Sequence, residues 1–255
     1  MRVTVLGSSA SYAGPGQACS GYLVEHADVR VLMDCGNGVV ANLAAVADPT
    51  TLDAVFITHE HPDHFLDIYA LAALLRYAPQ GPLAPLALWL PPGLFERMGC
   101  LLSERGRDEL AEAFVVHELT AEKPVRFGEL TITPHLVEHV DPTFALIAEG
   151  PGGTRVCYTS DTAPGPAALA AARGASLLIA EATLPQRYQG RAAHLTAAQA
   201  GELAREAQVE HLILSHIWPT NDKAAMLREA EAAFGGKVSI ATEFDAYDLE
   251  EGDTP

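Results

Sequence analysis

The chain has 255 residues, of which 49% are hydrophobic and 7% aromatic, and its 33 acidic and 16 basic residues give a formal net charge of −17. This length suits one large domain or two small ones. Since no linker-like stretch divides the chain, we expect a single domain over residues 1–249, followed by an acidic, disordered tail at 250–255. An acidic surface repels polyanions, so the composition disfavours a long nucleic acid such as tRNA or duplex DNA as the substrate.

The N-terminal sequence MRVTVLGSSAS contains only a short apolar run, too short for the core of a signal peptide. No run reaches the roughly 18 apolar residues of a membrane span. The four cysteines show no C-x-x-C spacing and are few for a disulfide framework, so we interpret them as free, mostly buried thiols. These features together predict a cytoplasmic protein with no membrane partner.

The first elements predicted along the chain are strands. Residues 2–6 alternate and are β-branched, which predicts a strand that ends in the turn-rich stretch GSSASYAGPG. Residues 21–25 and 29–34 predict a hairpin. The segment Asp34-Cys35-Gly36-Asn37-Gly38 follows the hairpin and leads into a helix that runs to residue 47.

The next stretch carries the densest chemistry of the sequence. Residues 52–57 are mostly apolar and predict a buried strand, which leads directly into Thr58-His59-Glu60-His61-Pro62-Asp63-His64. His59 and His61 alternate on an extended backbone and can point the same way, while Pro62 fixes a turn that lets Asp63 and His64 face a second point. The alternative is a solvated polar loop at the end of a strand. Packing these groups together without an ion would cost repulsion and desolvation, so we favour a metal site.

This stretch resembles the signature of the metallo-β-lactamase-fold hydrolases. The resemblance implies an α/β fold, a four-layer αββα sandwich, with a dinuclear metal site on its upper edge and further ligands on later strands. It also places Asp34 beneath the metal site, where a carboxylate can orient a ligand histidine. The other interpretation of Asp34 is a turn or cap residue.

The middle of the chain is predicted to hold helices and short strands. Residues 65–77 have apolar residues at helical spacing, residues 86–90 and 114–118 predict strands, and helices are expected at 94–102 and 103–113. From their position between strands, residues 91–113 are a candidate mobile lid over the site. The tRNA 3′-processing endonucleases that share this fold grip tRNA with a Gly- and basic-rich arm, and the sequence has no matching arm.

The second half supplies the other expected ligands. Residues 130–139 alternate and end at His139, where the resemblance expects a third histidine ligand. Residues 143–148 and 155–160 predict a second hairpin that ends at Asp161, whose carboxylate can bridge two cations, although an N-cap for the following helix is the alternative. Strands at 176–180, 209–214 and 238–247 alternate with helices at 197–207, capped by Thr196, and at 223–234, as the sandwich requires.

Two sets of ligands result. One ion is expected on His59, His61 and His139 and the other on Asp63, His64 and His216, with Asp161 shared between them. Zn²⁺ is the default for nitrogen-rich ligands mixed with carboxylates, although Mn²⁺ or Fe²⁺ would tolerate the same set. Two ions about 3.5–4 Å apart hold a bridging hydroxide whose pKa falls towards 7, and Asp63 can accept a hydrogen bond from it and aim it.

A leaving alkoxide also needs a proton, and His194 is the candidate donor. The stretch Ala193-His194-Leu195-Thr196 resembles the H-x-T motif of the phosphodiesterase and ribonuclease Z branch, in which this histidine contacts the phosphate and acts as an acid. Glu181, in a Glu-Ala-Thr that also resembles that branch, can orient the His194 ring and raise its pKa. The alternative for His194 is an ordinary loop histidine. The other histidines (His26, His117, His135 and His211) lack such a setting and are interpreted as structural or surface residues.

Several functions fit these ligands. Asp161 in place of a cysteine disfavours the antibiotic-hydrolysing lactamases, and the motifs around His194 and Glu181 favour phosphodiester chemistry. The layout over residues 1–249 resembles the short bacterial atypical class II cyclic-nucleotide phosphodiesterases, which implies a small phosphodiester substrate, 3′,5′-cyclic AMP among the candidates, and a homodimer. The alternatives are a tRNA 3′-processing endonuclease, a lactone or carboxylic ester hydrolase, and a non-catalytic metal-binding scaffold.

Overall fold

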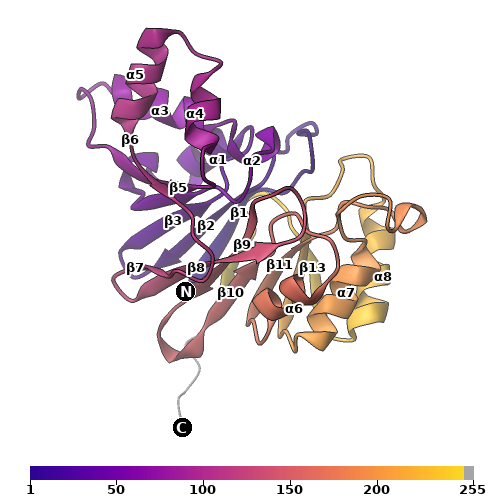
Figure 1. Cartoon of the computed structure of the whole chain (residues 1–255). Helices are drawn as coiled ribbons and strands as arrows, with labels where there is room; N and C mark the ends of the chain where they lie inside the picture. The colour runs from indigo at the N-terminus through magenta and orange to yellow at the C-terminus, as the bar shows by residue number, and fades with distance from the viewer. Residues whose placement is uncertain (250–255) are drawn as a thin grey trace.

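The computed structural model describes residues 1–249, and their strands form two sheets (Figure 1). The predicted tail at 250–255 lies outside the described residues. In spatial order, the first sheet contains β14 (Ala246–Asp248), β1 (Arg2–Gly7), β2 (Gly21–His26), β3 (Val29–Met33), β4 (Ala54–Phe56), β5 (Leu86–Leu90) and β6 (Phe114–Glu118). The second contains β13 (Lys237–Ile240), β12 (His211–Ser215), β11 (Leu177–Glu181), β10 (Arg155–Tyr158), β9 (Thr143–Glu149), β8 (Leu130–Val137) and β7 (Val125–Phe127).

Helices cover the outer face of each sheet. Those on the first sheet are α1 (Val39–Val46), α2 (Pro62–Phe65), α3 (Ile68–Tyr77), α4 (Leu94–Gly99) and α5 (Glu104–Ala113). Those on the second are α6 (Pro166–Ala172), α7 (Ala197–Glu206) and α8 (Lys223–Phe234). Single 3₁₀ turns lie at Pro49–Thr51, Pro151–Gly153 and Gln186–Tyr188. The four-layer αββα sandwich is therefore confirmed.

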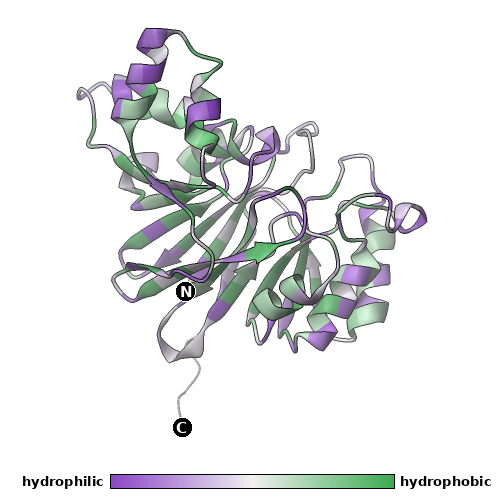
Figure 2. Cartoon of the chain, in the orientation of Figure 1, coloured by the Kyte–Doolittle hydropathy of each residue, from purple (hydrophilic) through white to green (hydrophobic). Residues whose placement is uncertain are grey.

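The hydrophobic core explains why the central strands are nearly continuous apolar runs. One cluster fills the space between the sheets, where Val5 and Phe56 of the first sheet face Leu146 and Ile179 of the second. Each sheet also has one cluster between its outer face and the helices that cover it. A strand buried on both faces has no polar face to present, so the sequence loses its alternation. Figure 2 shows the contrast, with mostly hydrophobic central strands and hydrophilic residues on the outer helices.

The helix predicted at 65–77 is two helices, because the chain turns at Leu66 and Asp67 between α2 and α3. The Asp67 carboxylate accepts hydrogen bonds from the backbone N–H groups of Gly38 and Val40, both at 2.9 Å. It therefore serves the first turn of α1 and not its own helix. Further along, α4 ends at Gly99, earlier than the predicted 102, and α5 follows after a short turn.

The strand predicted at 238–247 is wrong, since the segment forms two strands in different sheets. β13 pairs with β12, and β14 pairs with β1 on the other side of the sandwich. Between β13 and β14, Phe244 has a φ of 74°, which turns the chain. The segment contains no glycine or proline from which this turn could be predicted. The three-residue strand β7 was not predicted either. At the far end of β14, the Met1 amino group donates to the Leu249 carbonyl at 3.0 Å, and the Leu249 N–H donates to Met1 O at 2.8 Å.

The topology gathers the loops of interest at one edge. β3, β4, β5 and β6 run parallel to one another, as do β10, β11, β12 and β13, and β8 shares the direction of β10 because both are antiparallel to β9. The carboxyl ends of these strands carry the loops that contain the predicted ligands. Phe144 N–H donates to the Thr58 carbonyl at 3.1 Å and joins the two sheets at this edge. In the part of the chain that the structure describes, none of the helices has the length and apolar character to cross a membrane.

Candidate metal centre

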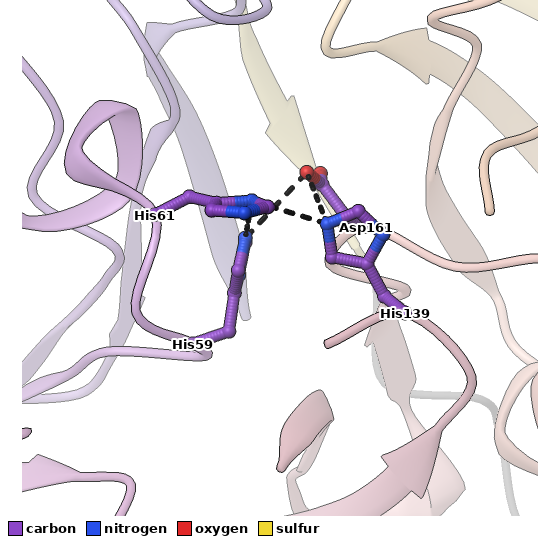
Figure 3. Close-up of side chains that lie close together, drawn as sticks. All are labelled: His59, His61, His139 and Asp161. Carbon is purple, nitrogen blue, oxygen red and sulfur yellow. Dashed lines mark hydrogen bonds and ion pairs between the residues drawn. The ribbon is translucent and has the colours of Figure 1, made fainter. Parts of the chain in front are cut away.

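The first group of converging donors contains His59, His61, His139 and Asp161. His61 Nδ1 lies 3.0 Å from His59 Nε2 and 3.1 Å from His139 Nε2, and Asp161 Oδ2 lies 3.6 Å from each of those two Nε2 atoms. Figure 3 shows the rings and the carboxylate pointing towards one another from the two sheets. Four donors about 2.1 Å from one tetrahedral ion lie about 3.4 Å apart, so these spacings fit a single metal ion.

The second group contains Asp63, His64 and His216. His216 Nε2 lies 3.3 Å from His64 Nε2 and 3.1 Å from Asp63 Oδ2, and the latter two atoms are 3.8 Å apart. The three donors lie within 4.8 Å of one another. Asp63 is held from outside as well, because the backbone N–H of Ser11 donates to Asp63 Oδ2 at 2.6 Å. This group also has the spacing of an ion site.

Asp161 lies between the two groups with one oxygen towards each. Its Oδ2 faces the first group, while its Oδ1 lies 3.5 Å from His64 Nε2. Oδ1 is buried and has no hydrogen-bond partner among residues 1–249, which is costly for a carboxylate unless a cation supplies the missing contact. Burial alone raises the pKa of Asp161, but His216 and His64 outweigh it and hold that pKa well below its usual value. The residues therefore fit a pair of metal ions that share Asp161.

Hydrogen bonds to the second ring nitrogen hold four of the histidines in place. His59 Nδ1 lies 3.1 Å from Thr58 Oγ1, His139 Nδ1 lies 2.9 Å from Ala193 O, His64 Nδ1 lies 2.6 Å from Asp34 Oδ2, and His216 Nδ1 lies 2.8 Å from Thr183 Oγ1. With Nδ1–H donating to an oxygen in each case, the lone pair of each ring lies on Nε2 and faces the centre. The arrangement presets all four rings for metal binding.

Asp34 is fully buried beneath the second group. Besides the contact with His64, its carboxylate accepts hydrogen bonds from Thr58 N at 2.8 Å, Thr58 Oγ1 at 2.9 Å and the Tyr158 hydroxyl at 2.8 Å. Its φ of 58° also makes it the turn residue that ends the hairpin strand. Burial lowers the pKa of His64, but Asp161 and Asp34 raise it more, so the surroundings of this ring favour a positive charge.

His194 lies at the edge of the centre. Its donor atoms lie within 4.8 Å of those of Asp161 and His216, and its Nδ1 lies 2.8 Å from Glu181 Oε1. The buried Glu181 also accepts hydrogen bonds from the Thr162 N–H at 2.8 Å and the Thr183 hydroxyl at 2.7 Å. Burial lowers the pKa of His194, but the hydrogen bond with Glu181 raises it above its ordinary value.

The loop that carries His194 begins and ends at the centre. Leu184 N–H donates to the Leu195 carbonyl at 3.0 Å, and Leu184 and Thr196 form an isolated β-bridge. Thr196 caps α7, as the sequence predicted, and forms a capping box with Gln199. The closure of this loop places Thr183 and His194 side by side at its base.

The structure brings together all seven predicted ligands, with His194 and Glu181 beside them, while their metal binding and roles stay predictions. Sequence reasoning gave no role to Tyr158, Thr183 or Ser11. Tyr158 had a readable signal, because a tyrosine in a buried strand needs a partner for its hydroxyl. The four histidines set aside lie elsewhere: His26 and His135 pair with Glu129 and Glu122, His117 stacks on Trp89, and His211 bonds to Ser239.

A four-layer αββα sandwich with a centre of histidines and aspartates at the carboxyl edge of its strands is the arrangement of the metallo-β-lactamase fold. Residues 29–217 match the family described as β-lactamase superfamily domain, so the chain belongs to this family.

Its relatives include metallo-hydrolases of known fold. An uncharacterized protein of Mycobacterium leprae (strain TN) is 34% identical over 98% of this chain and 89% of its own length. The probable metallo-hydrolase YhfI of Bacillus subtilis (strain 168) is 29% identical over 94% of this chain and 97% of its own length. The crystal structure of YhfI matches with a TM-score of 0.85 at 26% identity, covering 96% of this chain and 98% of that one. Ribonuclease Z of Myxococcus xanthus (strain DK1622) is 28% identical over 98% of this chain and 97% of its own length.

Proposed function

We propose that the protein is a metal-dependent phosphodiesterase that hydrolyses a small phosphodiester, with 3′,5′-cyclic AMP as the candidate substrate. The observation that carries the proposal is the pair formed by the half-buried His194 and the buried Glu181 beside the candidate metal centre. Hydrolysis of an alkyl phosphodiester releases a strongly basic alkoxide, so it needs an acid at the leaving oxygen. A carboxylic ester or lactone also releases an alkoxide, so the experimental test includes a lactone.

The residues would hold two divalent ions, for which Zn²⁺ is the default and Mn²⁺ or Fe²⁺ also suit the donors. When bound, the ions supply Lewis-acid polarisation of the phosphoryl oxygens and a water of lowered pKa. His59, His61 and His139 form one site and Asp63, His64 and His216 the other, with Asp161 common to both.

The protein's own groups then move the protons. Asp63 is ionised, because contacts with His216 and His64 outweigh its burial and hold its pKa below the ordinary value. It accepts a hydrogen bond from the attacking water and aims it at the phosphorus atom. His194 is held at Nδ1 by Glu181 and donates the proton at its other nitrogen, Nε2, to the leaving oxygen. The raised pKa of His194 keeps the ring protonated for this step.

A second candidate is tRNA 3′-end processing, which the similarity to ribonuclease Z favours. That alignment runs over 305 positions, whereas this chain has 255 residues, so the relative carries segments that this chain lacks. Long RNA also requires several neutralised phosphates, which a chain of net charge −17 does not offer readily. A small phosphodiester needs only the ions and a few contacts. We also propose a homodimer, as the family resemblance implies.

The test is hydrolysis of 3′,5′-cyclic AMP, bis(p-nitrophenyl) phosphate, a tRNA precursor and a simple lactone by metal-reconstituted protein. We expect cyclic AMP to be cleaved and His194→Ala to lose about 10²–10⁴-fold in kcat. His117→Ala, a histidine stacked on Trp89 away from the centre, is the matched control. Hydrolysis of the lactone with every phosphodiester left intact would refute the proposal.

The pH profile separates an acid role from a structural one. Because Glu181 raises the pKa of His194, Glu181→Gln lowers it, and the alkaline limb of kcat should move to lower pH. A profile that keeps its alkaline limb in the variant would exclude His194 as the acid.

A further inference from the structure

Two aromatic residues are carried by segments that are far apart in the sequence and meet beside the candidate metal centre. Tyr12 is in the loop that follows β1, and Trp218 is two residues beyond His216. Backbone hydrogen bonds join these segments, from Ile217 N to Ser8 O at 3.0 Å and from Ala10 N to Ile217 O at 3.2 Å. The two aromatic side chains are therefore attached to one rigid backbone unit.

This unit contacts the centre directly through Ser11. The Ser11 N–H donates to the Asp63 carboxylate at 2.6 Å, and Trp218 Nε1–H donates to the Ser11 hydroxyl at 3.4 Å. Ser11 has a φ of 62°, which is uncommon for a residue other than glycine and is found where a backbone is held for a purpose. Trp218 is thus hydrogen-bonded to Ser11, the residue that supports Asp63, and Tyr12 directly follows Ser11 in the sequence.

Both aromatic side chains are at least partly exposed to solvent. Tyr12 is 51% exposed and Trp218 is half-buried. An exposed tyrosine beside a charged centre gains nothing from burial, so packing does not account for it. The indole N–H already has a partner in Ser11, which leaves the flat faces of Trp218 as its remaining binding surface.

We propose that Tyr12 and Trp218 form the wall that binds the nucleobase of the substrate. The inference rests on the proposed phosphodiesterase function and makes its substrate a nucleotide. An aromatic side chain can stack on any nucleobase, and this contact needs no basic side chain. Stacking therefore suits recognition by a chain as acidic as this one. The ions would bind the phosphate while the aromatic wall selects for a flat heterocycle.

Binding can be measured without turnover, because the chain has only two tryptophans, Trp89 and Trp218. In a Trp89→Phe background, Trp218 is the sole tryptophan and reports on its own surroundings by fluorescence. We expect AMP to quench this fluorescence saturably in metal-reconstituted protein, and ribose 5-phosphate, which lacks the base, to leave it unchanged. Tyr12→Ala should weaken AMP binding about tenfold, and Tyr12→Phe, which keeps the ring, should restore most of the affinity. Tyr77→Ala removes an exposed tyrosine on α3 and is the control.

Kinetics then separate this inference from the proposed function. Trp218→Leu and Tyr12→Ala should raise KM for 3′,5′-cyclic AMP about tenfold, and Tyr12→Ala should affect the hydrolysis of base-free ribose 3′,5′-cyclic phosphate much less. Equal losses on both substrates would mean that the residues only support Asp63 and would overturn the inference, as would equal binding of AMP and ribose 5-phosphate. Tyr12-dependent binding of AMP by a protein with no phosphodiesterase activity would remove the proposed function and uphold the aromatic wall.

Discussion

Replacement of Asp34 by asparagine tests how the second group of ligands is held. The carboxylate accepts four hydrogen bonds, of which those from Thr58 and His64 come from the ligand loop and that from the Tyr158 hydroxyl comes from the other sheet. Asparagine has nearly the same shape and tolerates the positive φ of this position, so the backbone is expected to stay in place. The change therefore removes charge and one acceptor while leaving volume unchanged.

The cost follows from the number of donors. The asparagine amide has a single acceptor oxygen. We expect this oxygen to take the place of Oδ2, because three donors (His64 Nδ1, the Thr58 hydroxyl and the Tyr158 hydroxyl) meet there. Its NH₂ group then faces the Thr58 N–H, and a buried unpaired donor costs about 1–3 kcal/mol. Loss of such a supporting carboxylate typically lowers metal affinity about 10–100-fold, or about 1.4–2.8 kcal/mol at His64.

The assay is a competition titration of Zn²⁺ against a chromophoric chelator. We expect one of two binding events to weaken by that factor and the other, at the group containing His59, to change little. Asp48→Asn is the matched control, since Asp48 is an exposed aspartate that caps the turn at Pro49–Thr51. Unchanged affinity in Asp34→Asn would refute the reasoning that this carboxylate positions His64.

Three further outcomes are expected. Gly36→Ala should destabilise the protein by about 1–3 kcal/mol in denaturant unfolding and weaken metal binding, because an added Cβ would lie 2.1 Å from the Asp63 carbonyl, whereas Gly99→Ala meets only a flexible arginine and should be tolerated. His211 has its pKa lowered to about 4 by burial and by Lys237, so the folded state keeps it neutral while the unfolded chain takes up a proton near 6.5. Stability should therefore fall by up to about 3 kcal/mol as the pH drops from 6.5 towards 4, and His211→Gln should flatten that part of the curve. Removal of both metal ions by a chelator should lower Tm by about 10–20 °C relative to protein with ions at 100 times their dissociation constant, and an unchanged Tm would mean that the centre does not bind metal in the folded protein.

Much of the fold follows from local pattern. The strands with continuous apolar runs and the helices with a clear amphipathic face, such as α7, were predicted with the right type. Two of the misses share a cause, since each depends on a distant partner. Asp67 splits a helix because it serves α1, and β14 leaves β13 because β1 offers it an edge.

The metal-ligand candidates were easier to predict from the sequence than the residues that hold them in place. His59, His61, Asp63 and His64 stand together in the sequence, so their spacing alone indicated an ion site. Contacts such as Tyr158 with Asp34, or Ser11 with Asp63, join residues that are 124 and 52 positions apart. Residue spacing carries no information on such pairs, because the packing of strands and loops that are distant in the sequence creates them. Whether residues 91–113 act as a lid stays a prediction. The structure shows α4 linked to the ligand loop, with Arg97 and Glu60 in an ion pair at 2.8 Å.

The hydrogen bonds between Met1 and Leu249 bear on how far the centre depends on chain connectivity. The two residues are adjacent in space, so a short linker would join them without moving β1 or β14. The chain could then be opened in the exposed stretch between α3 and β5, at the edge opposite the ligands. In such a rearranged polypeptide His216 would be made before His59, yet every donor would keep its neighbours. The order of the elements along the chain can thus change while their spatial arrangement stays the same, and only the spatial arrangement determines how the donors of the centre are placed.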